Sequence, residues 1–104
     1  MTYNILIPVK NGGSVYILNN SRNTVLYIGV TSDLPRRIQE HKEGQIPGFT
    51  KQYNVNRLIY CESHSNIEEA IVREKQIKGK TRAKKLAIVA TQNPQFEDLS
   101  ESLF

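Results

Sequence analysis

Five side chains in this sequence belong to types that can do phosphate chemistry together. Tyr16 and Tyr27 stand eleven positions apart, and Tyr27 begins a Tyr-Ile-Gly tripeptide. Arg37 and His41 follow ten and fourteen residues after Tyr27, and Glu74 comes much later. A phenol, a guanidinium, an imidazole and a carboxylate can together activate water, offset phosphoryl charge and hold a metal ion. This set therefore indicates phosphodiester cleavage.

Length and composition predict a single small domain. The chain has 104 residues, of which 38% are hydrophobic, enough for one modest core. No apolar run approaches the roughly 18 residues that a membrane span needs, and 1–9 lacks the features of a secretory signal. Cys61 is the one cysteine, so an internal disulfide is impossible. We expect a cytoplasmic protein without membrane contact, a monomer or weak dimer.

Positive charge is unevenly distributed along the chain. Lysine and arginine number 14 against 10 acidic residues, which gives a net charge of +4. Seven of these bases lie between positions 73 and 85 beside one acid, whereas 96–104 holds three acids and no base. A basic stripe suits a polyanionic partner. The alternative is an ordinary solvated helix face.

Residue patterns predict three strands. Segments 14–18 and 24–30 are rich in β-branched and aromatic residues, and the Asn-rich segment 19–23 between them has turn chemistry, so they form a hairpin. A third strand is expected at 56–61. Segment 3–9 is a candidate edge strand, because a proline inside a strand is confined to sheet edges.

Three helices complete the expected fold. The first spans 34–42, with Ser32 or Asp33 as its N-cap, and is followed by a loop at 45–54. The others span 67–78, capped by Asn66, and 82–90. The order β-β-α-β-α-α predicts an α/β (α+β) domain in which helices flank a small, three-stranded, mainly antiparallel sheet.

The helical faces contain the informative anomalies. Arg37 and His41 share a face with two apolar residues, Leu34 and Ile38. Glu74 interrupts an apolar stripe on the helix over 67–78, formed by Ile67, Ala70, Ile71 and Ile77. A half-buried carboxylate needs a metal or a charge partner. The structural alternative to a metal site is an Arg37–Glu74 ion pair. Tyr16 and Tyr27 have the alternative of being ordinary strand aromatics, and Gly29 of marking a bulge or a close helix contact.

The motifs resemble those of the GIY-YIG nucleases, in particular the small single-domain bacterial type. Ser14-Val15-Tyr16 corresponds to the first family tripeptide with only its tyrosine kept, whereas Tyr27-Ile28-Gly29 is intact. The resemblance places the family's remaining site residues on Arg37, His41, Glu74 and Asn93. It covers 14–99, which leaves 1–13 as an N-terminal extension and 100–104 as an acidic tail.

The resemblance implies a metal-dependent DNA endonuclease. Glu74 would bind one Mg²⁺ or Mn²⁺ ion, Arg37 would contact the phosphate, and the base would be Tyr16, Tyr27 or His41. Recognition would follow DNA structure rather than sequence, with single-stranded and branched DNA as the candidate substrates, in repair or processing. The expected DNA-binding residues are Arg36, Lys75, Lys78, Lys80, Arg82, Lys84 and Lys85. The alternative function is a non-cleaving nucleic-acid-binding module of the same fold.

Overall fold

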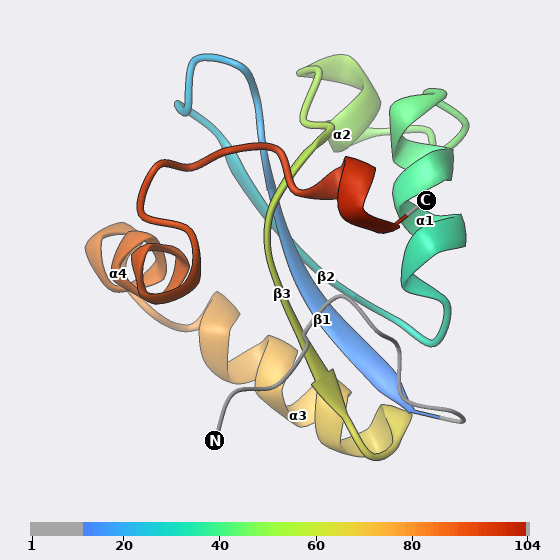
Figure 1. The fold of residues 1–104 in the computed structure, drawn as a ribbon, viewed down its shortest axis with the longest axis vertical. Coiled ribbons are helices and arrows are strands. Elements are labelled where there is room, and N and C mark those ends of the chain that lie inside the picture. The colour runs from blue at the N-terminus through green and yellow to red at the C-terminus, as the bar shows by residue number, and fades with distance from the viewer. Residues whose placement is uncertain (1–11, 104) are drawn as a thin grey trace.

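The computed structural model describes residues 12–103, so the candidate strand at 3–9 lies outside the described residues. Its elements are β1 (Gly13–Asn19), β2 (Leu26–Thr31), α1 (Leu34–Lys42), α2 (Phe49–Gln52), β3 (Arg57–His64), α3 (Ile67–Lys78), α4 (Arg82–Gln92) and the 3₁₀ helix η1 (Ser100–Leu103). The strands form one sheet in the order β2-β1-β3, and both pairings are antiparallel (Figure 1). The predicted α+β fold is confirmed. Within 12–103, no helix has the length and apolar character needed to cross a membrane.

Side chains of β1 alternate between two cores, because successive residues of a strand point to opposite faces. Val15 and Ile17 lie in the cluster that contains buried residues of α3 and α4. Tyr16 and Leu18 lie in the other cluster, with buried residues of α1 and partly buried leucines near the C-terminal end. The sheet therefore separates an α1 layer from a layer made of α3 and α4 (Figure 1).

The helix starts follow the predicted capping chemistry. At α1 the cap is Asp33, whose carboxylate accepts a hydrogen bond from the Arg36 backbone N–H at 3.2 Å. Asn66 caps α3 in the same way through the Glu69 N–H at 2.9 Å. Gly44 follows α1 with φ of 67°, a backbone conformation that favours glycine. The N-caps therefore fix where α1 and α3 begin.

Three local predictions were wrong. The expected loop 45–54 contains α2, which begins after Gly48 at φ 104°. β3 continues to His64, three residues beyond the predicted end, because its later residues still pair with β1. Ile71 is 38% exposed and does not belong to the buried stripe of α3, whose fully buried members are Ala70 and Ile77.

The outer edge of β3 is covered by the segment that follows α4. The Gln92 side chain bonds both the N–H and the carbonyl of Cys61, at 3.1 and 2.8 Å. Leu58 donates its N–H to Asp98 and accepts from the Leu99 N–H at 2.7 Å. Asp98 also forms an ion pair with Lys42 of α1. Side chains and one main-chain bond from the C-terminal residues thus satisfy backbone groups along the outer edge of β3.

Candidate active site

Tyr16 lies in the middle of the sheet, and Gly29 makes room for its ring. The two residues are directly opposite each other in the β1–β2 pairing. A Cβ atom at position 29 would lie 2.4 Å from both Cζ and the hydroxyl oxygen of Tyr16. The close contact at Gly29 is therefore with a tyrosine of the neighbouring strand, rather than with a helix. The register irregularity of the sheet lies elsewhere, at Ile17 and Leu18 of β1.

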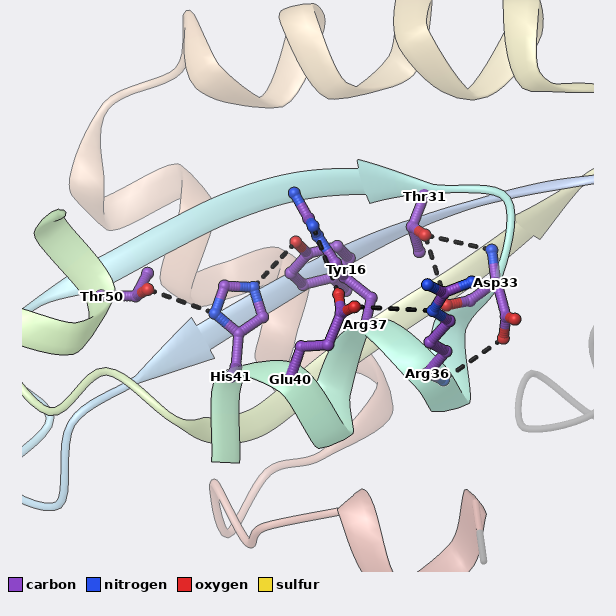
Figure 2. Close-up of polar contacts among 8 residues, drawn as sticks. All are labelled: Tyr16, Thr31, Asp33, Arg36, Arg37, Glu40, His41 and Thr50. Carbon is purple, nitrogen blue, oxygen red and sulfur yellow. Dashed lines mark hydrogen bonds and ion pairs between the residues drawn. The ribbon is translucent and has the colours of Figure 1, made fainter. Parts of the chain in front are cut away.

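A chain of hydrogen bonds connects β1, α1 and α2 on one face of the sheet (Figure 2). The Tyr16 hydroxyl and His41 Nε2 form a hydrogen bond of 3.1 Å. The other ring nitrogen of His41, Nδ1, bonds the Thr50 hydroxyl at 3.2 Å. Tyr16 is 1% exposed, His41 5% and Thr50 7%. The orientation of the imidazole is thus fixed from both sides by buried partners.

Burial keeps both members of the Tyr16–His41 pair neutral. Burial, helped by the charge of Arg37, lowers the pKa of His41 to about 4. Burial raises the pKa of Tyr16 to about 12, although the Arg37 guanidinium opposes this rise. At neutral pH the Tyr16 hydroxyl is then protonated. A neutral Tyr16 hydroxyl and a neutral His41 imidazole therefore share a hydrogen bond without a charge on either side chain.

Arg37 extends beside Tyr16 from α1 and holds its charge at the surface of the site. Its interaction with the Tyr16 hydroxyl raises the Arg37 pKa. One guanidinium nitrogen pairs with Glu40 at 3.4 Å, while Nε is buried without a hydrogen-bond partner in the described structure. Arg37 lines a polar hollow of about 250 Å³ together with Thr31, Ser32, Asp33, Arg36 and Glu40. This guanidinium has donors left for an anion that enters the hollow.

Tyr27 is the second phenol of the cluster and the less buried one. Its ring centroid lies 6.3 Å from that of Tyr16 and 5.7 Å from that of His41. Its exposure is intermediate, in contrast to the 1% of Tyr16. The structure therefore brings four of the predicted site residues together: Tyr16, Tyr27, Arg37 and His41.

Glu74 does not contact this cluster. It lies on α3, in the layer on the other face of the sheet, and forms an ion pair with Lys78 at 3.3 Å. Its side chain is only 13% exposed, whereas that of Lys78 is 52% exposed. The structural alternative of an Arg37–Glu74 ion pair is wrong, because each residue pairs within its own helix. Among residues 12–103, no group of three or more acidic, histidine or cysteine side chains is placed to hold a metal.

Asn93 also lies away from the cluster, at the C-terminus of α4. Its amide nitrogen donates to the carbonyl oxygens of Ile59 at 3.0 Å and Glu97 at 2.8 Å. Its amide oxygen accepts the Glu97 N–H at 3.0 Å, and the residue is 5% exposed. These bonds satisfy the buried amide and hold the chain against the edge of β3, which is a structural role.

The predicted DNA-binding residues are divided between the two layers. Arg36 lies on α1 and pairs with Glu40 at 3.5 Å. The other six lie in α3, in α4 or between them: Lys75, Lys78, Lys80, Arg82, Lys84 and Lys85. Lys80 and Lys84 line a groove of about 310 Å³ with Arg73. Arg82 donates to the Asn23 carbonyl at 2.8 Å, which joins α4 to the hairpin turn.

Two partners in the site were not identified from the sequence. Thr50 falls within the predicted loop, and nothing local in the sequence signals its bond to His41. Glu40 stands three residues after Arg37, a spacing at which helical side chains are neighbours, so this pair was detectable. His64 also has an unforeseen partner, Glu62, at 2.6 Å, and Glu62 further accepts from Tyr60 and Arg73.

Comparisons with known proteins show the family and the fold of this chain. The profile of the GIY-YIG catalytic domain matches residues 12–87. A UPF0213 protein of Pediococcus pentosaceus is 40% identical over 80 residues, which are 77% of this chain and 83% of that protein. A UPF0213 protein of Syntrophus aciditrophicus is 38% identical over 82 residues, 78% and 92% of the two chains. The solution NMR structure of a UPF0213 protein of Bacillus halodurans has a TM-score of 0.55 and 29% identity, and the match covers 86% of this chain and 95% of that one.

Proposed function

Because this chain belongs to the GIY-YIG family, we propose that it is an endonuclease that hydrolyses DNA phosphodiester bonds with the help of one divalent metal ion. The observation that carries the proposal is the buried Tyr16–His41–Thr50 hydrogen-bond chain beside Arg37, whose side chain is 39% exposed and lines a polar hollow.

Arg37 supplies the phosphate contact in this mechanism. A phosphate in the hollow beside α1 would accept hydrogen bonds from its guanidinium, which stays charged at any working pH. Negative charge grows on the non-bridging oxygens as water attacks, so this contact strengthens in the transition state. Glu40 holds the guanidinium from the other side. It is the positioning residue for Arg37.

Tyr27 is the phenol that contacts the attacking water in this proposal. Tyr16 is 1% exposed, so its hydroxyl does not face solvent, whereas Tyr27 is partly exposed. Tyr16 and His41 then act behind Tyr27, as a pair whose rings contact it and fix its position. The sequence alone left three candidates for this role, and the burial of Tyr16 and His41 supports Tyr27.

Glu74 is the residue that would hold the metal ion. Its single carboxylate fits Mg²⁺ or Mn²⁺, because such ions are commonly bound through one or two carboxylates, with waters and phosphate oxygens as the other ligands. Its partner Lys78 is half exposed and can move into solvent when a cation arrives. When bound, the metal would supply positive charge at Glu74, on the opposite face of the sheet from the Arg37 hollow, so its part in the reaction requires DNA that reaches both faces.

The test is cleavage of a panel of labelled DNA structures by the purified full chain, with Mg²⁺, Mn²⁺ or EDTA. Cleavage that requires a metal and falls by orders of magnitude in Arg37→Ala, Tyr27→Phe and Glu74→Gln supports the proposal. Glu69→Gln serves as a matched control, because it removes one exposed carboxylate from the same helix as Glu74. DNA binding without any cleavage would assign the non-cleaving function instead. Cleavage by Glu74→Gln with unchanged metal dependence would remove Glu74 from the site.

A further inference from the structure

Two aromatic rings on α2 are exposed next to the candidate site. Phe49 is 47% and Tyr53 49% exposed, and their ring centroids lie 5.0 Å apart. α2 has only four residues, and it is anchored by Thr50, which is 7% exposed. Large exposed apolar side chains that gather in one place mark interaction sites. These rings contact each other and remain available to a partner.

The position of the rings is fixed relative to the site by Thr50. The Thr50 hydroxyl bonds His41 Nδ1 at 3.2 Å, and His41 in turn bonds Tyr16 (Figure 2). Phe49 is the covalent neighbour of Thr50, and Tyr53 lies four residues after Phe49. Any ligand held by the two rings is therefore held at a set distance from the cluster of Tyr16, Tyr27 and His41.

Two polar hollows meet at α2 and mark a path away from the cluster. The first has about 170 Å³ and is lined in part by His41, Thr50, Lys51 and Asn54. The second has about 390 Å³ and includes Tyr53, Asn54 and Arg22 in its lining. Asn54 belongs to both hollows, so they are neighbours. Both hollows therefore lie against the chain around α2, and the second includes the ring of Tyr53.

The lining of the second hollow suits a nucleotide. It offers the side-chain amide of Asn54, the guanidinium of Arg22 and the ring of Tyr53, and its lining holds no acidic residue. Exposed aromatic rings stack on nucleobases, and cations beside them contact the phosphates. Stacking on a side chain requires an unpaired base, because the faces of paired bases inside a duplex are already covered.

We propose that Phe49 and Tyr53 form a stacking platform for unpaired bases, so that this protein engages single-stranded DNA beside its cleavage site. The proposal rests on the proposed function in taking DNA as the ligand. It assigns the single-stranded DNA that the resemblance left as one candidate to a particular surface, the rings of Phe49 and Tyr53. It also assigns a role to α2, an element outside the cluster.

The test measures binding by the full chain in EDTA, so that cleavage plays no part. The probes are a labelled single strand of about 15 nucleotides, long enough for one such site, and the duplex of the same sequence. The variants are Phe49→Ala, Tyr53→Ala and their combination. Val72→Ala is the matched control, since Val72 is a 57% exposed apolar residue on α3. Circular dichroism verifies the fold of each variant.

The expected result is a loss of single-strand affinity of at least roughly fivefold in the double variant, the smallest effect expected from one stacked base. The duplex affinity of the double variant should change less than twofold. The single-strand affinity of the Val72→Ala variant should also change less than twofold. If the double alanine variant does not fold, a Phe49→Leu and Tyr53→Leu pair replaces it, because leucine keeps apolar bulk without a π-face. The same selective loss is expected from that pair.

Unchanged single-strand affinity in a folded double variant would overturn the proposal, as would an equal loss on duplex. A wild-type chain that binds the single strand no better than the duplex would also overturn it. A selective loss from a chain that never cuts DNA would leave the platform in place and refute the nuclease function. Cleavage by the wild-type chain, with no selective loss of single-strand affinity in the double variant, would support the nuclease function and refute the platform.

Discussion

Replacement of Gly29 by alanine is the sharpest test of how the sheet holds Tyr16. The added methyl would lie 2.4 Å from the Tyr16 Cζ and hydroxyl oxygen and 2.9 Å from Cε1. Optimal contacts between carbon atoms are roughly 3.5–4.0 Å, so the overlap exceeds about 1 Å. Tyr16 is 1% exposed and cannot swing into solvent. The ring or the strand must move.

The magnitude has two opposing parts. Overpacking a close-packed core destabilises by about 1–3 kcal/mol. Alanine also stiffens the unfolded chain, which stabilises by about 0.4–1 kcal/mol where the backbone suits it. It suits position 29, because the positive-φ glycines are Gly44 and Gly48. The net is a destabilisation of about 1.3 kcal/mol, or a fall in Tm of roughly 5–10 °C for a domain of this size.

The assay is a double-mutant cycle followed by thermal and denaturant unfolding. The second change is Tyr16→Leu, which removes the atoms that the methyl would meet. In that background the steric part disappears, and Gly29→Ala should stabilise by about 0.4–1 kcal/mol. The effect of one substitution thus changes sign. The same small loss in both backgrounds would refute the argument that Gly29 exists to accommodate Tyr16.

Three further predictions concern the buried polar groups. His41 has a folded pKa of about 4 against 6.5 unfolded, so the unfolded state binds more protons between these values. Stability is then full above pH 6.5 and falls by up to about 3 kcal/mol as pH drops toward 4. Urea unfolding at several pH values should show this slope in wild type and a weaker one in His41→Gln. Tyr16→Phe removes the partner of His41 Nε2, and unfolding should show a loss of about 1–3 kcal/mol; an unchanged Tm would mean that the bond is not formed. Asn93→Ala should destabilise by a similar amount while cleavage per folded molecule changes little, whereas a catalytic Asn93 would lose activity without losing stability.

The sequence predicted the order of strands and longer helices along the chain, and most residues of the Tyr16 cluster, because those signals are local. Caps at Asp33 and Asn66 and β-branched runs set the elements, and the spacing of Arg37 and His41 placed both on one helix face. The partners of these residues depend on contacts between distant segments. Thr50 reaches His41 from a segment with loop composition, and Asn93 bonds a strand 34 residues earlier in the chain. Glu74 shares a periodic stripe with core residues. The periodicity of one helix does not predict that the sheet lies between Glu74 and Tyr16.

The cover over β3 means that the smallest folding unit is longer than the matched catalytic domain. The profile match ends at residue 87, yet Gln92, Asn93, Asp98 and Leu99 supply the bonds along the outer edge of that strand. A chain shortened to 87 would keep every residue of the Tyr16 cluster and expose a row of unpaired backbone groups. Such an edge is a template for a strand of another molecule. We therefore expect the shortened chain to aggregate, and work on the isolated nuclease domain needs the residues through 103.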